Sequence, residues 1–454
     1  MRINLKSLLL ASILAILTVA LVACGGKDDN DKSGDSNANG ASEDEEVTLK
    51  LAALESAYGK EVWEKIIEDY EAKHENVTIE LTAEKNLEEV VRPQMQAGEY
   101  PDIFLLATGR EEALPETLIK ENGLEDITDV FDMNVDGEDV KVKDKLLDGF
   151  TDTLATNPYG DDKTYLAPMF YSPAGLFYNK NLLEEHGWDV PETWDEMFAL
   201  GEKAEKEGIS LFTYPVAGYF DTLLGSMLYA SGGPDFYNEA MTYEDGAWES
   251  EEATSVFETV EKLKDYTHPN TVANANPNDF TKNQQLVLDN KALFMPNGSW
   301  VVDEMKEAPR ADGFEWGMTS IPAFEDGGDQ YAFTFFEQMW IPKEGENKEA
   351  AKQFITYMYS DEAADTFLEA GAVQPINDIT DKLDEEKVTY YSIYEDEGAL
   401  PALGTFATTA PVEGVNISET LYETIDSVMS GTKSYKEWQK EVEAASDKLR
   451  PALK

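Results

Sequence analysis

VTLKLAA at residues 47–53 alternates as a β-strand does, and EVWEKIIEDYEAKH at residues 61–74 then repeats its apolar side chains at helical spacing. The same order follows at once, with a strand expected over residues 77–81 and a helix over residues 87–97. IFLLA at residues 103–107 is an uninterrupted apolar run of the kind found in buried parallel strands. This β-α-β-α-β order predicts parallel strands joined by right-handed crossovers.

The loops after the first and third of these strands are the first candidates for a binding site. They comprise residues 55–58 and residues 108–111. Because ligands on parallel sheets usually lie beyond the carboxyl ends of the strands, we expect both loops at the ligand-binding edge.

The pattern restarts near Thr164, so the chain predicts two α/β lobes. TWDE at residues 193–196 has the spacing of a capping box, at the start of a helix that is expected to end near Gly208. The sequence contains no repeat with a period of about 20–50 residues, which argues against a solenoid or a propeller. The other expected strands are 165–171, 174–178, 209–214, 292–295 and 317–321, and the other expected helices are 221–230, 251–266 and 279–288.

Charge and composition exclude several classes of protein. The chain has 454 residues, with 36 Lys and Arg against 91 Asp and Glu, and its formal net charge is −55. Such a charge repels phosphate backbones, which excludes nucleic acid as a partner. A hydrophobic content of 42% is too high for a disordered acidic chain, so the bulk of the protein is expected to fold.

The N-terminal residues predict export and lipid anchoring. Two basic residues precede an apolar run over residues 8–22, which is the arrangement of a secretory signal. The run closes on LVACG at residues 21–25, and these residues resemble the lipobox of bacterial lipoproteins. The resemblance implies that residues 1–23 are removed as a signal peptide and that Cys24, the only cysteine of the chain, is lipidated. A plain signal peptide with an incidental cysteine and an uncleaved membrane anchor are the alternatives.

A polar linker follows the predicted lipidation site. Residues 24–46 contain no aromatic or large aliphatic side chain, and a flexible coil of this length spans about 25 Å. We therefore expect a folded body tethered to the extracytoplasmic face of the bacterial cell membrane. No segment after residue 24 is long and apolar enough to predict a membrane-spanning helix.

Several motifs along the expected body occur in the order and spacing of one known family. They are GEYPD at 98–102, GLFYNK at 175–180, PETWDE at 191–196, NGSW at 297–300, and the run from Lys348 to Ser360 followed by DEAA at 361–364. In this combination the chain resembles the extracellular family 1 solute-binding proteins of carbohydrate ABC importers, which include the maltodextrin-binding proteins.

The resemblance implies a two-lobe, periplasmic-binding-protein-like α/β fold, in which each lobe is a mostly parallel sheet flanked by helices and the ligand lies in a cleft at the hinge. Scaled onto this sequence, lobe 1 comprises residues 47–164 plus 335–372, and lobe 2 comprises residues 165–334 plus 373–454. Such lobes close around a ligand by hinge motion. The implied partners are an oligosaccharide and the membrane permease subunits of an ABC importer, and we expect a monomer. Similar binding proteins handle N-acetylhexosamine-containing glycans, although no residue here by itself requires an acetamide.

Aromatic side chains are the first candidates for holding a sugar. A neutral sugar offers apolar C–H faces and hydroxyl groups, so its site needs aromatic platforms and planar polar groups. By resemblance, Trp300 takes the place of the family's stacking tryptophan, and Tyr219 and Phe220 match an aromatic pair before a helix. The alternatives are a core tryptophan and an aromatic pair that anchors the start of that helix.

Arg110 is the candidate cation, because its rigid five-donor group suits adjacent hydroxyls. It matches a ligand-contacting arginine of the maltodextrin binders, but Gly109 stands where those proteins have an acid, which weakens the case for maltodextrin itself. A surface ion pair is the alternative for Arg110. Glu55, Ser56 and Tyr58 are candidates from their position in the loop after the first strand alone.

A further group of candidates falls where the resemblance puts crossings between the lobes. Phe336 and Glu337 belong to this group, together with Phe335 and Trp340, and Tyr171 lies at the other crossing. Hinge packing is the alternative to ligand contact for each of these residues.

One acidic loop resembles half of a calcium site. Asp132, Asn134 and Asp136 place oxygen ligands at alternate positions with Gly137 at the sixth, as in an EF-hand, but the twelfth position is Lys143. A solvated acidic turn is therefore the better interpretation, and we expect neither a metal nor another cofactor.

Other functions are weaker alternatives to sugar import. The chain has three histidines and neither an HExxH nor a GxSxG motif, so metal or serine hydrolysis is not predicted and the protein is not expected to be an enzyme. A secreted glycosidase with two catalytic carboxylates, a binding protein for a peptide or a polyamine, and an adhesive lipoprotein remain as alternatives.

Overall fold

The computed structural model of the protein describes residues 46–453, apart from residues 57, 111, 152, 162, 396, 397 and 408. The predicted signal peptide, Cys24 and the linker up to residue 45 lie outside the described residues. Within the described part of the chain, none of the helices has both the length and the apolar character needed to cross a membrane.

The expected β-α-β-α-β unit is confirmed. β1 (Val47–Leu54) pairs in parallel with β2 (Val77–Glu84) on one side and with β3 (Ile103–Leu105) on the other. The helices between these strands are α1 (Glu61–Lys73) and α2 (Leu87–Gln96). The loops after β1 and β3 therefore start from the same edge of the sheet.

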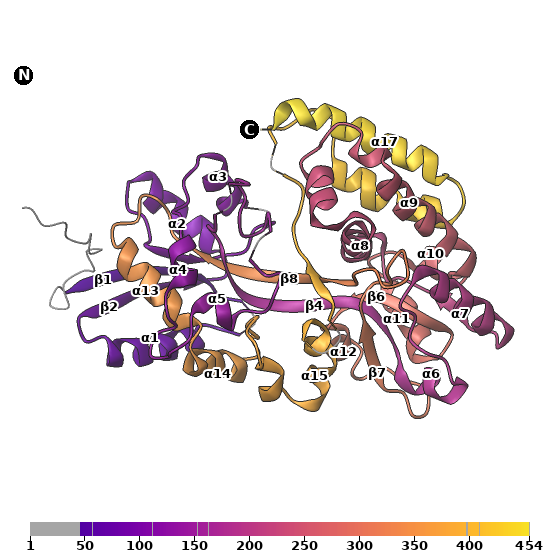
Figure 1. Ribbon diagram of the computed structural model, residues 1–454, viewed down its shortest axis with the longest axis horizontal. Helices are drawn as coiled ribbons and strands as arrows, with labels where there is room; N and C mark the ends of the chain where they lie inside the picture. The colour runs from indigo at the N-terminus through magenta and orange to yellow at the C-terminus, as the bar shows by residue number, and fades with distance from the viewer. Residues whose placement is uncertain are drawn as a thin grey trace, which may run out of the picture. The chain divides into compact units, whose positions relative to one another are not determined.

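Two long strands form the middle of the described sheet, whose order is β2-β1-β3-β8-β4-β6-β5. β4 (Ala167–Asn179) and β8 (Tyr331–Trp340) run antiparallel along one another, as Figure 1 shows. The sequence predicted two separate strands in place of β4. The chain instead continues through Pro173, which pairs with Thr334, and a register shift between Pro168 and Phe170 absorbs the irregularity. Antiparallel pairing at the centre was not predicted, so the sheet is mixed, with parallel strands toward both ends.

The second half of the chain adds strands to this sheet and a group of helices. β6 (Ala292–Gly298) pairs with β4 and with β5 (Ser210–Phe212), while β7 (Trp316–Thr319) pairs with β4 and β9 (Leu400–Ala402) with β8. α8 (Phe220–Met241), α9 (Glu251–Leu263) and α17 (Tyr435–Leu449) lie together in Figure 1. The other α-helices are α3 (Leu114–Lys120), α4 (Thr128–Asp132), α5 (Val142–Lys145), α6 (Lys180–His186), α7 (Trp194–Lys206), α10 (Thr271–Asn274), α11 (Phe280–Leu288), α12 (Val301–Glu304), α13 (Lys348–Met358), α14 (Asp361–Glu369), α15 (Glu385–Tyr391) and α16 (Ile425–Met429).

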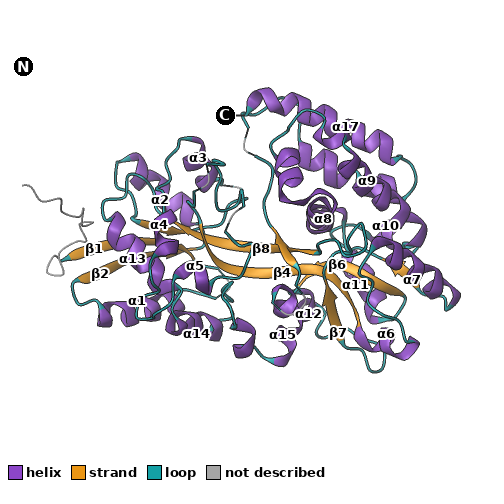
Figure 2. Ribbon diagram, viewed as in Figure 1, coloured by secondary structure: helices purple, strands orange, loops and turns teal. Residues whose placement is uncertain are grey.

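Helices cover both faces of the β1–β3 part of the sheet (Figure 2). Because successive residues of a strand point to opposite faces, neighbouring residues pack against different helices. Leu51 and Leu105 pack in one apolar core with the buried side chains of α1, α13 and α14. Ala52 and Phe104, their neighbours in sequence, pack in another core with α2 and α3. This double coverage explains why the strand at residues 103–105 reads as a continuous apolar run.

The predicted cap of α7 forms in part. The Thr193 side chain accepts a hydrogen bond from the Glu196 N–H at 3.3 Å, as a capping box requires. The Glu196 carboxylate accepts from the N–H of Glu192, at 2.9 Å, instead of from that of Thr193.

The acidic loop at residues 132–137 is held by basic side chains of the protein itself. Lys143 Nζ lies 2.7 Å from Asp132 Oδ1, and His74 Nε2 lies 3.2 Å from Asp136 Oδ2. The residue at the twelfth position thus pairs with the one at the first.

Candidate functional site

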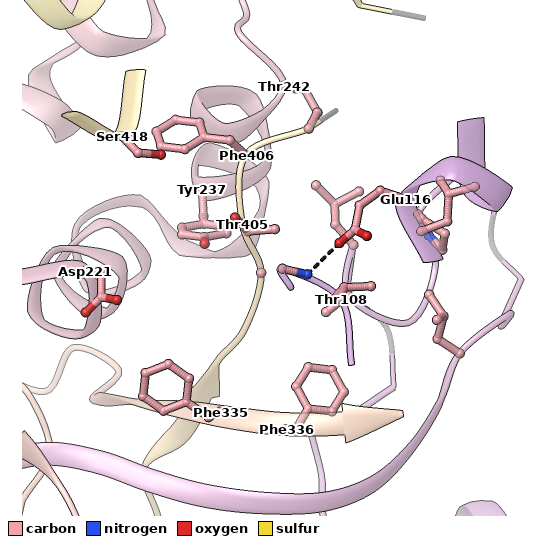
Figure 3. Close-up of a pocket in the computed structure, with 18 of the residues that line it drawn as sticks. Thr108, Glu116, Asp221, Tyr237, Thr242, Phe335, Phe336, Thr405, Phe406 and Ser418 are labelled. Atoms are coloured by element: carbon pink, nitrogen blue, oxygen red, sulfur yellow. Dashed lines mark hydrogen bonds between the residues drawn. The ribbon is translucent and has the colours of Figure 1, made fainter. Parts of the chain in front are cut away.

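A cleft of about 940 Å³ lies over the middle of β8. Residues 333–336 of β8 form its floor. One side, which we call the β3 wall, consists of Thr108 and Gly109 after β3, Glu116, Ile119, Lys120 and Asn122 in and after α3, and Leu154, Ala155, Pro158, Tyr159 and Leu166. The other side, the α8 wall, consists of Gly218, Asp221, Tyr237, Thr242, residues 404–407, Ser418, Glu419, Tyr422, Glu423 and Leu453 (Figure 3).

Exposed aromatic rings meet beside the floor of the cleft. Trp300 is 37% exposed and Phe335, a floor residue, is 42% exposed, and their ring centroids are 5.5 Å apart. The Trp300 indole N–H lies 3.5 Å from the hydroxyl oxygen of Tyr219, and these two rings are 6.4 Å apart at an angle of 53°. The structure thus brings Trp300 and Tyr219 together across 81 residues of sequence and leaves an apolar surface open.

Gly298 allows the indole to take this position. β6 ends at Gly298, and Trp300 precedes the short helix α12. A Cβ atom on residue 298 would lie 1.9 Å from the Trp300 ring, far inside van der Waals contact. The NGSW motif therefore has a steric reason for its glycine.

Phe220 does not lie at the cleft, in contrast to the prediction from the sequence. Its side chain is fully buried and packs edge-on against Tyr214, with ring centroids 5.0 Å apart. Phe220 is the first residue of α8, so successive side chains there point in different directions. The alternative, that the aromatic pair anchors the start of the helix, holds for Phe220, whereas Tyr219 is half-buried beside Trp300.

The loop after β1 contacts β8 through a buried carboxyl group. The Tyr58 hydroxyl donates a hydrogen bond to Glu337 Oε2, and the Ser56 side chain is hydrogen-bonded to the same carboxylate. Burial raises the pKa of Glu337, against the lowering effect of these two hydrogen bonds. Burial, followed by the charge of Glu337, also holds the pKa of Tyr58 well above its usual value. Glu55 is directed to Lys85, at 3.6 Å.

Arg110 pairs with a buried acid that the sequence did not single out. Its Nε lies 2.5 Å from Glu88 Oε1 and its Nη2 lies 3.3 Å from Glu88 Oε2. Glu88, in the first turn of α2, is fully buried. The predicted alternative of an ion pair is therefore the observed state, and the two-point contact fixes the direction of the guanidinium group.

The remaining predicted residues divide between the cleft and the core. Phe336 lines the floor of the cleft. Tyr171 is buried among Phe150, Tyr391 and Tyr394, with ring centroids 5.0–5.9 Å away, and so does not line the cleft. Tyr171 in β4 is therefore a packing residue and not a residue of the cleft lining.

Two acids in the walls were missed by the sequence analysis. Asp221 belongs to the α8 wall, where burial raises its pKa to about 6 although the Thr222 N–H, at 2.6 Å, stabilises the ionised form. Glu116 belongs to the β3 wall, where its Oε1 accepts a hydrogen bond from the Gly109 N–H and its Oε2 is buried without a partner. Asp221 directly follows the aromatic pair and could have been included with it. Nothing in the sequence distinguishes Glu116 from the many other acids.

An α/β fold with a roomy cleft, exposed aromatic rings beside its floor and paired polar groups around it is that of a binding protein for a small solute. The chain belongs to the family of bacterial extracellular solute-binding proteins, whose family model matches residues 55–365. The family also fixes an extracellular setting for the folded body.

Individual relatives agree with this assignment. The diacetylchitobiose-binding protein NgcE of Streptomyces coelicolor is 27% identical over 377 residues, which cover 78% of this chain and 77% of NgcE. Among solved structures, the solute receptor AcbH, described as preferring β-D-galactopyranose, matches with a TM-score of 0.68 at 19% identity, over 91% of this chain and 99% of the receptor. A chitin oligosaccharide binding protein matches with a TM-score of 0.58 at 19% identity, over 89% of this chain and 99% of that protein. The predicted fold class is therefore confirmed, and these relatives are binding proteins.

Proposed function

We propose that the protein is the substrate-binding lipoprotein of a carbohydrate ABC importer and that it captures an oligosaccharide in the cleft. The single observation that carries the proposal is the exposed aromatic surface of Trp300 and Phe335 beside the cleft floor. Large apolar side chains are seldom exposed together without a ligand or a partner to cover them. A sugar ring covers such a surface with its C–H face and turns its hydroxyls toward the walls.

An N-acetylhexosamine-containing glycan is the ligand we favour. One relative is named as a diacetylchitobiose-binding protein and one structural neighbour as a chitin oligosaccharide binding protein. An acetamide adds a methyl group, which the aromatic floor suits, and an N–H donor, which suits a wall carboxylate. Maltodextrin is less favoured, because Gly109 stands in place of an acid beside Arg110.

Capture requires the two sides of the cleft to approach one another. In the proposal, lobe 1 comprises residues 47–164 plus 335–372 and lobe 2 comprises residues 165–334 plus 373–454, joined through β4 and β8. Trp300, Tyr219, Phe335 and Phe336 supply the stacking surface in this scheme, while Arg110, held by Glu88, supplies hydrogen-bond donors. The closed form then presents the unaltered ligand to the permease, as a population shift between two lobe arrangements.

Anchoring is a separate part of the proposal. A diacylated Cys24 holds the monomeric body near one patch of membrane, and the linker sets a high effective concentration at the permease. The lipobox supports the anchor, and the extracellular family agrees with it.

A cationic solute such as a polyamine is the second candidate. Four carboxylates, from Glu116, Asp221, Glu419 and Glu423, line the cleft, against one lysine, Lys120. Such a lining attracts a cation, and an aromatic ring can also hold a cation against its face. A sugar remains the first candidate, because the named relatives are sugar-binding proteins.

A thermal-shift screen tests the choice between these ligands. The full chain is heated with diacetylchitobiose, maltotriose, raffinose, galactose or spermidine, because a ligand that binds only the folded state raises the melting temperature. A saccharide that stabilises the protein and is recovered unaltered supports the proposal. Stabilisation by spermidine alone would favour the second candidate. Recovery of cleaved saccharide would favour the alternative that the protein is a glycosidase.

A further inference from the structure

Each of the two walls of the cleft carries one carboxylate that has few hydrogen-bond partners within the protein. Asp221 projects from the start of α8 on one side, and Glu116 projects from α3 on the other, as Figure 3 shows. They come from segments more than 100 residues apart, so their presence in one cleft follows from the fold and not from a local motif.

Asp221 has little to compensate for its burial. Within the described residues, the only hydrogen bond to its carboxylate comes from the adjacent Thr222 N–H, and none of the ion pairs involves it. The titratable side chains that sense its charge are the phenols of Tyr219, Tyr237 and Tyr422, none of which supplies a positive charge. Glu419 and Glu423 line the same wall. A carboxylate in this environment gains from any donor that a ligand brings.

Glu116 is in a comparable state on the β3 wall. One of its oxygens accepts a hydrogen bond from the Gly109 N–H, and the second oxygen is buried without a partner in a residue that lines the cleft. Buried polar atoms without a partner are costly, and a native structure that keeps one usually has a role for it.

We propose that Asp221 and Glu116 are a pair of ligand acceptors, one on each wall, which fix a donor-rich saccharide by accepting hydrogen bonds from its hydroxyl or amide N–H groups when the walls close. The inference rests on the proposed function and adds to it the chemistry that the walls select. A ligand that offers donors at both ends satisfies both carboxylates, whereas a ligand that reaches only one wall leaves the other carboxylate buried and unpaired. The pair therefore favours a ligand long enough to reach both walls.

The sign of the pH dependence follows from this arrangement. Donors stabilise the ionised carboxylate, so binding lowers the pKa of Asp221 from its value of about 6 in the empty cleft. Affinity is therefore full above about pH 7 and falls as the pH drops through 6. If only the ionised form binds, the loss at pH 5 is about 10-fold, because about nine-tenths of a group with that pKa is then protonated. A ligand that offered an acceptor to Asp221 would give the opposite slope.

The test is calorimetric titration of the full chain with the saccharide of the thermal-shift panel that binds it most tightly, at pH 5.0 and at pH 7.5. Asp221→Asn and Glu116→Gln keep the shape of each side chain and remove its charge. Each is expected to weaken binding about 10-fold at pH 7.5, the usual effect of losing a charge-assisted hydrogen bond. Asp221→Asn is also expected to abolish most of the difference between the two pH values, whereas Glu116→Gln retains it.

Matched controls separate this effect from a general change of charge. Asp235 lies in α8 beyond its break at Gly233, and Glu121 directly follows the helix of Glu116. Both side chains are exposed and neither lines the cleft, so Asp235→Asn and Glu121→Gln serve as the controls. Neither control is expected to change affinity. Unchanged affinity in Asp221→Asn and Glu116→Gln, or tighter wild-type binding at pH 5.0, would overturn the inference while leaving saccharide binding intact. If no saccharide of the panel binds the wild-type chain, the proposed function fails and the inference falls with it.

Discussion

Trp300→Ala is expected to weaken saccharide binding and to leave the unliganded fold almost as stable. The side chain is 37% exposed. Since a tryptophan offers up to about 250 Å² of surface, a sugar laid on the exposed part covers about 90 Å², which at about 25 cal/mol per Å² is worth about 2 kcal/mol. That free energy corresponds to a loss of about 30-fold in affinity. It lies within the range of about 1–3 kcal/mol found for stacking of a base on an aromatic side chain.

Two measurements check this prediction together. Isothermal titration calorimetry gives the affinity for the best saccharide of the panel, and differential scanning calorimetry gives the melting temperature without ligand. The melting temperature is expected to fall by only a few degrees, because the contacts of the indole with Tyr219 and Phe335 are themselves partly open to solvent.

Trp438→Phe provides the matched control. Trp438 is fully buried in α17, and its indole N–H donates to the carbonyl oxygens of Thr420 and Leu421 at 3.2 and 3.1 Å. Its replacement is expected to lower the melting temperature clearly and to leave the affinity unchanged. If Trp300→Ala behaves in this second way, with unchanged affinity and a large loss of stability, then Trp300 is a core residue and the stacking surface is refuted.

Three further predictions concern the support of the site and its anchor. Gly298→Ala places a methyl group where the Trp300 ring lies, so calorimetry is expected to show about a 10-fold loss of affinity, and the double variant with Trp300→Ala is expected to lose no more than Trp300→Ala alone; additive losses would contradict the steric explanation. Glu88→Gln leaves the Arg110 guanidinium without its buried counter-charge, so the free energy of unfolding measured in urea is expected to fall by about 3 kcal/mol. The control Glu125→Gln removes the partly exposed partner of Lys348 and is expected to lower that free energy by less than about 1 kcal/mol. Equal losses would argue against a structural role for the buried pair. Cys24→Ser removes the predicted lipidation site, so the protein is expected to leave the detergent phase in phase partitioning, and retention there would point to an uncleaved anchor.

The local pattern of the sequence was sufficient for the outer parts of the fold. Alternation over residues 47–53 and the apolar run at residues 103–107 correctly gave parallel strands, because the helices that follow these strands, α1, α2 and α3, supply much of their apolar packing. The distant helices α13 and α14 complete one of the two faces. The centre of the sheet was less predictable. β4 pairs with β8, some 160 residues away, and this long-range pairing carries the strand through Pro173, where local rules predict a break.

The site was predictable only in part, since direction and partner are set by tertiary contacts. Tyr219 and Phe220 are both aromatic and adjacent, and the sequence does not say which of them turns toward Tyr214 in the core. The partner of Arg110 is one of 91 acids, and only the folded chain shows that Glu88 is the buried one beside it. The meeting of Trp300 with Tyr219 came from resemblance to a family, because no spacing rule connects two residues so far apart.

β8 is the element on which the two sides of the cleft come together. Phe335 contacts Trp300, which follows β6, and only two residues further along Glu337 accepts a hydrogen bond from Tyr58 in the loop after β1. Two residues of a strand span about 7 Å, so a ligand stacked on Phe335 and Trp300 already lies close to the segment that anchors that loop. β4 pairs with β8 along this stretch, from Phe333 to Met339, and so fixes its backbone on that side. Phe335 and the Glu337 partner of the Tyr58 loop are therefore held in register by one strand, and in the proposed closure of the two lobes β8 is the element that links the Trp300 surface to that loop.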